Sequence, residues 1–275
     1  MNTRLTKEDQ AMIKEAKGNK VSRPIYSEDG LRLLKVLGNP EYLEVKDGVK
    51  AICDEACQGL DNLHDVVLPA SVIYLGTRAF ASCIKLFKIT MPGVELIGTE
   101  SFAHCENLKE ISLPETLGKI WEGAFASCKA LEQINIPSHL RIIDKSAFRN
   151  SGLKSLNIVI NNDHYCWIFD RAFAYCKHLE SVYLNKNVKI VERMAFAGCT
   201  SLKTIEFENP SLTGLIGETD LIAEINTTML IGCTSLEKII VPKNKYNHYP
   251  DFNIQGYESA QFETRDFNSL VTPKE

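Results

Sequence analysis

The residues with the clearest chemical potential in this 275-residue sequence are its nine cysteines. Clustered thiols can form disulfides, bind zinc or act as redox pairs. Cys53 and Cys57 are separated by three residues, which does not match the spacing of a redox or zinc pair. Six others share one position of a repeat: Cys83, Cys105, Cys128, Cys176, Cys199 and Cys233.

Regular spacing limits what these six cysteines can do. Stacked repeats lie about 4.8 Å apart, which brings neighbouring residues within reach of some disulfides. Ladder side chains run parallel, however, so we expect free thiols that fill small apolar gaps, with disulfides as the alternative. A zinc site would need His104 beside Cys105, or His178 near Cys176, to share a direction, whereas we expect the cysteines inside and the histidines outside.

Motifs for catalysis are missing from the sequence. We find no phosphate-binding glycine loop, no nucleophile-elbow serine and no His-Glu-x-x-His pair. Cys166 lies outside the repeat position and is either a buried strand residue or a reactive exposed thiol. The sequence therefore predicts a protein that is not an enzyme and that holds no cofactor and no metal.

Composition narrows the classes of partner. Hydrophobic residues make up 44% and charged residues 24%, which suits a globular protein, and the net charge of −4 gives no reason to expect nucleic acid or an anionic membrane as a partner. No apolar run reaches the roughly 18 residues of a membrane span. Residues 1–9 carry charges where a signal peptide is apolar, so we expect a cytoplasmic monomer without membrane insertion, or a secreted or cell-surface protein if the sequence is trimmed.

A short repeat organises most of the chain. Closing residues such as Pro92 and Pro114 recur at intervals of 22 or 23 residues, and two degenerate units begin at Ala56 and Ala147, the second with one residue deleted before Leu153. The most similar segments, each ending in cysteine, are residues 79–83, 101–105, 124–128, 172–176, 195–199 and 229–233.

Each repeat is too short to bury its own apolar side, so repeats must stack. In the unit around Ile111 and Leu113, alternation predicts a strand with these two residues inside and Glu110 and Ser112 outside. Proline then ends the strand because it has no N–H to donate. The alanine–phenylalanine segment is expected to form a tight turn or a short helix, with its phenylalanines in a column inside the core.

The repeats share the pattern apolar-x-x-Ile-Gly-x-x-Ala-Phe-x-x-Cys-x-x-Leu-x-x-Ile-x-Leu-Pro, which residues 94–114 match nearly throughout, with Ser101 at the alanine position. This pattern resembles the BspA-like, or Treponema-type, leucine-rich repeat family. The resemblance implies an α/β-type repeat solenoid: a right-handed superhelix with a parallel concave β-sheet, short turns or helices on the other side, and a cap at both ends. It also implies recognition of a protein or matrix ligand, and it brings no catalytic residues.

The predicted organisation has three parts. Residues 1–25 form an N-terminal cap, 26–246 a solenoid of about eight repeats with insertions near 160–165 and 209–221, and 247–275 a C-terminal cap and tail. Thr6 and Asp9 resemble a capping box that starts a helix, and Gly18 would suit its C-cap. This helix either seals the first repeat or binds a partner. The aromatic-rich C-terminal segment is expected to cover the last repeat, with a binding tail as the alternative.

The predicted function is protein–protein interaction through the concave face or the insertions. Carbohydrate or extracellular-matrix binding by an adhesin-like module is the alternative; an amide-rich strip favours it, but sugar stacking would need more exposed aromatic residues. The candidate contact residues are Lys88, Glu110, Gln133, Asn135, Asn157, Tyr183 and Glu206 on outward strand positions, with His164, Tyr165 and Trp167 at the rim.

Overall fold

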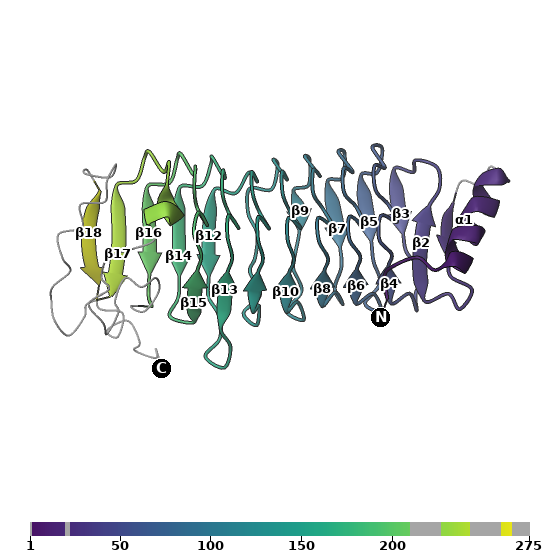
Figure 1. Cartoon of the computed structure of the whole chain (residues 1–275), viewed down its shortest axis with the longest axis horizontal. Coiled ribbons are helices and arrows are strands. Elements are labelled where there is room, and N and C mark those ends of the chain that lie inside the picture. Colours follow the sequence, from purple (N-terminus) through teal and green to yellow (C-terminus); the bar gives the residue numbers. More distant parts are fainter. Residues whose placement is uncertain (1, 20–22, 210–226, 243–259, 266–275) are drawn as a thin grey trace.

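The computed structural model describes residues 2–19, 23–209, 227–242 and 260–265. The chain winds into a parallel β-solenoid of about eight turns, with the N-terminal helix at one end (Figure 1). This architecture confirms the fold predicted from the repeat.

Three sheets run along the solenoid, and all their strand pairs are parallel except β1–β2. Sheet A contains, in spatial order, β1 (Pro24–Tyr26), β2 (Arg32–Val36), β4 (Ala51–Ile52), β6 (Tyr74–Leu75), β8 (Leu96–Ile97), β10 (Lys119–Ile120), β11 (Ile142–Ile143), β13 (Cys166–Ile168) and β15 (Val188–Val191). Sheet B contains β3 (Tyr42–Glu44), β5 (Asp65–Val67), β7 (Lys88–Thr90) and β9 (Glu110–Ile111). Sheet C contains β12 (Ser155–Ile158), β14 (Ser181–Leu184), β16 (Thr204–Phe207), β17 (Lys238–Pro242) and β18 (Gln261–Arg265).

Sheets B and C are formed by the alternating segments that the sequence predicted as strands. Sheet A was not predicted as a set of strands. Its strands form where an apolar residue, two variable residues and another apolar residue precede each alanine–phenylalanine turn. Val94 and Ile97 illustrate the pattern, and both side chains are fully buried. The strands of sheet A and of sheets B and C therefore enclose one continuous apolar core.

The alanine–phenylalanine segments form tight turns that stack as regularly as the strands. The amide of Phe102 donates to the carbonyl of Ala124 in the next turn of the solenoid, at 2.8 Å. The predicted phenylalanine column is confirmed, because neighbouring rings from Phe80 to Phe196 are nearly parallel with centroids 5.1–5.5 Å apart. The residue before each cysteine adopts a left-handed conformation, for example Ser127 with φ of 61°, which explains why Gly198 fills that position in a later turn.

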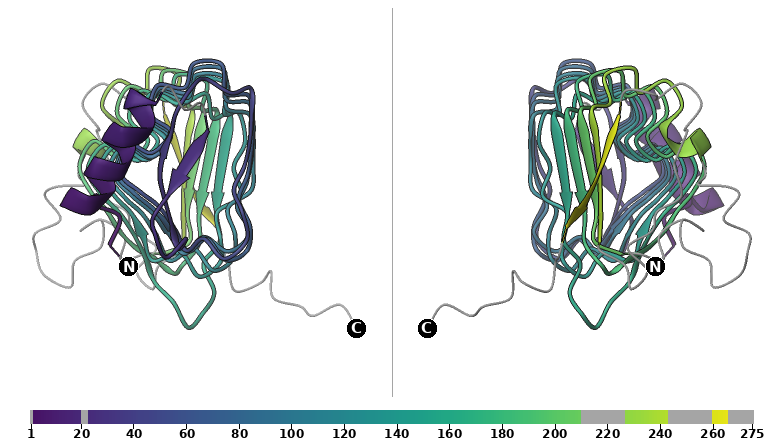
Figure 2. Two further views of the ribbon diagram at one scale, coloured as in Figure 1. Left: turned by 90° about the vertical axis from the view of Figure 1, so that its right-hand side faces the viewer. Right: turned by 90° about the vertical axis from the view of Figure 1, so that its left-hand side faces the viewer.

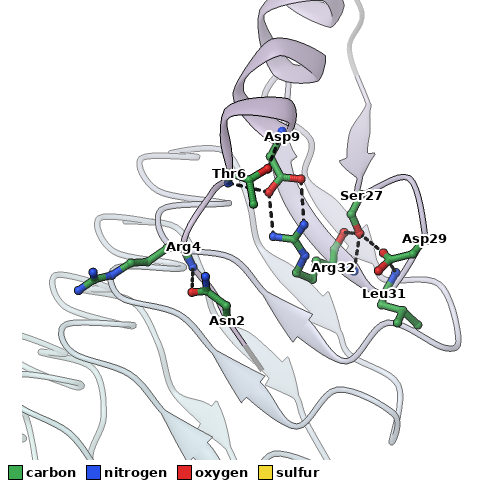
Figure 3. Close-up of polar contacts among 8 residues, drawn as sticks. All are labelled: Asn2, Arg4, Thr6, Asp9, Ser27, Asp29, Leu31 and Arg32. Carbon is green, nitrogen blue, oxygen red and sulfur yellow. Dashed lines mark hydrogen bonds and ion pairs between the residues drawn. The ribbon is translucent and has the colours of Figure 1, made fainter.

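The N-terminal helix α1 (Lys7–Gly18) lies at the end of the solenoid, beside its first strands (Figures 1 and 3). Thr6 and Asp9 form the expected capping box, while Ile13 is buried against the core. The Asp9 carboxylate also accepts two hydrogen bonds from Arg32, of 2.8 and 3.0 Å. The helix continues through Gly18, so Asn19 rather than Gly18 is the C-cap.

The two ends of the predicted organisation differ in how much is described. Strand β18 pairs with β17 and extends sheet C, as expected for a segment that covers the last repeat. The remainder of the predicted C-terminal part lies outside the described residues, as does the insertion expected near 209–221 beyond residue 209. A short 3-10 helix, η1 (Thr227–Leu230), precedes the last alanine–phenylalanine-like turn.

The pairing of Asp9 with Arg32 predicts a dependence of stability on pH. Burial opposes the charged form, but hydrogen bonds from Thr6 and Arg32 outweigh it and hold the pKa of Asp9 below its usual value. A lowered folded-state pKa means that the stabilisation is complete above the unfolded pKa of about 3.9 and is lost as the pH falls through the folded pKa. We expect Asp9→Asn to lower the free energy of unfolding by about 2 kcal/mol at pH 7.

The measurement is urea unfolding of parent and variant at pH 7 and at pH 2.5. The difference between the two proteins is expected to be smaller at the lower pH, because the stabilisation by the charged Asp9 carboxylate is lost as the pH falls through its lowered folded-state pKa. Asp29→Asn is the matched control, because Asp29 bonds only Ser27 and Leu31 at an exposed turn. A difference between parent and Asp9→Asn that does not change with pH contradicts the prediction.

Candidate functional site

The outward positions of sheets B and C, and of residues 131–137 between them, form a polar surface, here called the polar ladder. The structure places the predicted residues Lys88, Glu110, Gln133, Asn135 and Asn157 in exposed positions and Tyr183 and Glu206 in half-buried ones. Many charges on this face pair between neighbouring turns: Lys88 with Glu110 at 3.0 Å, Lys154 with Glu132 at 2.7 Å, and Arg265 with Glu206 at 2.6 Å.

Asn135 has a task within the fold. Its Oδ1 accepts a hydrogen bond from the amide of Leu113 at 3.0 Å, and its Nδ2 donates to the carbonyl of the same residue at 2.8 Å. Residues 131–137 contain no strand, so sheet B ends at β9 and sheet C begins at β12. The side-chain amide of Asn135 thus replaces a backbone pairing between two turns and is not free for a ligand.

Tyr183 lies in the register of the polar ladder between Asn157 and Glu206, so the structure brings these three predicted residues together. Burial and the negative charges of Glu208 and Glu206 raise the pKa of Tyr183 to about 12. Trp167 belongs to β13 in sheet A, however, whereas Tyr183 belongs to β14 in sheet C. The polar ladder and Trp167 therefore lie on different sheets, and the expected single contact surface is divided.

Sheet A carries an exposed surface that the sequence analysis missed. Its outward residues follow one another in register and are mostly apolar or aromatic. Trp167 is 44% exposed and Ile190 is 42% exposed. We call this set the apolar column: Tyr74, Leu96, Ile142, Trp167 and Ile190.

Lys119 occupies the middle of the apolar column, between Leu96 and Ile142. Its ammonium lies 3.4 Å from the centroid of the Trp121 ring and 3.2 Å from the Asp144 carboxylate. The charge is therefore neutralised locally by a carboxylate and an aromatic face. The column can present a largely apolar face in spite of this lysine.

The loop between β12 and β13 projects beyond the other turns, at the bottom of Figures 1 and 2. Residues of this loop line a pocket together with residues of the preceding turn. Its volume is about 350 Å³. We call it the corner pocket, and its lining residues are Arg141, Ile142, Asp163, His164, Tyr165 and Trp167. The predicted rim residues His164, Tyr165 and Trp167 thus share one site, together with Arg141 and Ile142 from the preceding turn.

Neighbouring side chains orient the rings of the corner pocket. Phe169 packs against the Trp167 indole at 71°, with centroids 6.4 Å apart. The Lys189 ammonium lies 4.9 Å from the centroid of the Tyr165 ring, and the His164 imidazole meets His139 edge-on at 4.8 Å. The pocket therefore has aromatic walls whose positions are fixed by the adjacent turns.

The cysteines have a structural arrangement. All nine are free and buried. In the repeat position, each thiol lies against a backbone carbonyl of an earlier turn, as Cys105 does with Phe80 at 3.1 Å and Cys128 with Phe102 at 3.2 Å. Cys166 is fully buried, which raises its pKa to about 12, so the alternative of a reactive exposed thiol was wrong.

Metal and membrane sites were also sought in the described part of the chain. No group of three or more histidine, cysteine, aspartate or glutamate residues is arranged there to hold a metal ion. None of its helices has the length and apolar character needed to cross a bilayer.

Comparison with solved structures finds bacterial leucine-rich repeat proteins. A leucine-rich repeat protein from Bacteroides ovatus is 19% identical over 88% of this chain and 76% of that chain, with a TM-score of 0.49. The T. pallidum leucine-rich repeat protein is 23% identical over 78% and 87% of the two chains, with a TM-score of 0.48. A leucine-rich cell surface protein from Faecalibacterium prausnitzii is 17% identical over 90% and 93%, with a TM-score of 0.46.

Comparison at the level of sequence is decisive for the family. No curated protein matches the chain. The BspA type leucine rich repeat region, however, matches residues 50–166 and 167–251 in six copies. These matches span most of the solenoid and confirm the resemblance seen in the repeat. The chain belongs to the BspA-type leucine-rich repeat family.

Proposed function

We propose that this chain is a non-enzymatic scaffold that binds a protein partner, and that the apolar column of sheet A is its main contact surface. The observation that carries this proposal is a row of apolar side chains in register on a parallel ladder, of which Trp167 and Ile190 are exposed and Tyr74, Leu96 and Ile142 are half-buried. Proteins with leucine-rich repeats typically mediate protein interactions. Grouped apolar residues on a surface are a common mark of such contacts.

The polar ladder and the apolar column would offer a partner different kinds of contact. On the polar ladder, a partner would have to compete with ion pairs such as Lys88–Glu110, which already satisfy the charges. On the apolar column, burial of Leu96, Trp167 and Ile190 would remove apolar surface from water, a favourable change of roughly 25 cal/mol per Å². Tryptophan and tyrosine also dominate binding energy in many interfaces. The proposed partner is therefore a protein with a complementary apolar patch, bound by a monomer of this chain.

The test compares variants of the two ladders. A partner is isolated from the source cells by affinity capture with the parent chain, and its affinity is then measured by surface plasmon resonance. We expect Leu96→Asp and Ile190→Asp each to weaken binding at least tenfold, because a charge would be buried without a partner. Tyr183→Ala and Asn157→Ala on the polar ladder are expected to change affinity less than twofold.

Two results would overturn this assignment of the surface. One is unchanged affinity in both aspartate variants, with loss in the polar-ladder variants. The other is a parent chain that sediments as a dimer and becomes monomeric in the aspartate variants, since the column would then bind a second copy. Urea unfolding midpoints of all variants should match the parent, because the substituted side chains are exposed or half-buried.

A further inference from the structure

We infer that the corner pocket is a binding site for a neutral hexopyranose, as a residue of a glycan. This function goes beyond protein binding by the apolar column. Three features of the pocket carry it: exposed aromatic rings, charged groups of opposite sign that are not paired, and a backbone that is fixed in place.

The aromatic rings match the apolar side of a sugar ring. A pyranose presents C–H groups on its faces and hydroxyls around its rim, so it needs an aromatic surface and polar groups together. Tyr165 is 56% exposed and Trp167 is 44% exposed, and Ile142 extends the apolar wall. Few exposed aromatic residues could be foreseen from the repeat, and the corner pocket brings two of them together.

The polar groups of the pocket are not engaged with one another. In the described part of the chain, neither the Arg141 guanidinium nor the Asp163 carboxylate has an ion-pair or hydrogen-bond partner. The contrast with the paired charges of the polar ladder is clear, since Lys88, Lys154 and Arg265 all contact a carboxylate of another turn. Unpaired charges beside exposed aromatic rings are groups that a ligand can satisfy.

The signs of these charges select the class of ligand. A guanidinium only donates hydrogen bonds and a carboxylate only accepts them, whereas a hydroxyl does both. An anionic ligand that satisfied Arg141 would be repelled by Asp163, and a cationic ligand would be repelled by Arg141 and by Lys189 beside Tyr165. A neutral polyol can accept from Arg141 and donate to Asp163 in the same complex. A volume of about 350 Å³ lies at the lower end of the range for small-molecule sites.

The backbone around the pocket is held before any ligand binds. Asn161 donates from its amide to the carbonyl of Ser138 at 2.9 Å and from its side chain to the Ser138 hydroxyl at 3.0 Å. The amide of His164 closes the turn on the carbonyl of Asn161 at 3.0 Å. Trp167 is fixed in register between Ile142 and Ile190. Such preorganisation lowers the entropy lost on binding.

The experiment uses the full chain and a panel of methyl glycosides and neutral oligosaccharides. The panel contains the common neutral hexoses, N-acetylhexosamines, a uronic acid, and short acidic and basic peptides as non-sugar probes. Binding is followed by saturation-transfer NMR and by tryptophan fluorescence. At least one neutral hexopyranoside is expected to bind in the low millimolar range and to change the fluorescence, while the uronic acid binds at least tenfold more weakly.

Variants assign the signal to the pocket. Trp167→Ala is expected to abolish binding, and Arg141→Gln and Asp163→Asn each to weaken it about tenfold. Trp121→Phe is the matched control for the second tryptophan, and Leu96→Asp is the control for the apolar column; both should bind the sugar like the parent. Trp167 belongs to both the corner pocket and the apolar column, so Arg141→Gln and Asp163→Asn separate the two proposals: loss of sugar binding in these two variants with intact binding of the protein partner assigns the sugar to the corner pocket.

Several outcomes would overturn the inference. These are the absence of binding by every neutral sugar in the panel, preference for the uronic acid or for a peptide, and equal binding by the parent and Trp167→Ala. The unfolding midpoint of Trp167→Ala is measured beside its binding, because the indole is only 44% exposed and packs on Phe169. Arg141→Gln and Asp163→Asn change exposed side chains and should keep the midpoint of the parent, so their loss of binding would not reflect a loss of fold.

Discussion

Replacing Phe125 by alanine is expected to lower the free energy of unfolding by about 3–5 kcal/mol. Phe125 is fully buried in the middle of the phenylalanine column, with ring centroids 5.2 Å from Phe102 and 5.1 Å from Phe148. The truncation removes a ring from the core and leaves a cavity that two neighbouring turns line. Those turns cannot collapse into it, because the amide of Phe125 bonds the carbonyl of Ala147 and fixes the spacing.

The position of Phe125 in a repeat array adds a second expectation. In a solenoid each turn contacts only its neighbours, so a weak turn in the middle can uncouple the two halves. Urea unfolding followed by far-UV circular dichroism and by tryptophan fluorescence should give coincident curves for the parent and separated curves for Phe125→Ala. Phe87→Ala is the control, since Phe87 is half-buried outside the column and stacks on His64. A loss in Phe125→Ala no larger than that in Phe87→Ala would contradict the prediction.

Much of the fold could be predicted from the sequence because the same pattern of buried and exposed residues occurs in every repeat. Phenylalanine recurs at the same position of each repeat, 22 to 25 residues apart, and residues at equal positions of stacked turns become neighbours, so the column could be predicted directly. The alternation around Ile111 and the capping box of Thr6 and Asp9 can each be recognised from a few consecutive residues. Local patterns of this kind need no knowledge of distant contacts.

The apolar column was missed because its strands are too short to show alternation. Most strands of sheet A contain two residues, for example Leu96–Ile97. Both residues are apolar, and the sequence analysis placed only the second in its core pattern. Neighbouring residues in a strand point to opposite faces, so a pair of consecutive apolar residues predicts one on the surface. That signal also recurs in Ile142–Ile143 and could have identified the column.

The corner pocket and the role of Asn135 depended on contacts between turns. Arg141 lines the same pocket as Asp163 and Trp167 because residues about one repeat apart in the sequence become neighbours when the turns stack. Asn135 was assigned to the outside by alternation, and its exposed side chain nevertheless turns to the backbone of Leu113. Periodicity gives the face of a residue, but it does not give the hydrogen bonds that the residue makes there.

The deletion in the fifth repeat, which begins at Ala147, leads to the second large prediction. Two residues separate Cys128 from Leu131, whereas only Gly152 separates Ser151 from Leu153. The shortened chain passes so close to the preceding turn that the amide of Gly152 donates to the carbonyl of Cys128 at 3.1 Å. A Cβ atom on Gly152 would lie 2.0 Å from the carbonyl oxygen of Lys129. This contact involves backbone, so neither partner can move without shifting a whole turn.

Gly152→Ala is therefore expected to lower the free energy of unfolding by about 3 kcal/mol, at the upper end of the cost of overpacking. Urea unfolding is again the measurement, and Gly118→Ala is the matched control, because a Cβ there would have no neighbour within 4 Å. Since alanine restricts the unfolded chain, the control should be unchanged or up to about 1 kcal/mol more stable. Equal stabilities of the two variants would show that the shortened turn relaxes freely. A large loss confined to Gly152→Ala would mean that the deletion is tolerated only because a glycine lies beside it, where any side chain would meet the backbone of the preceding turn.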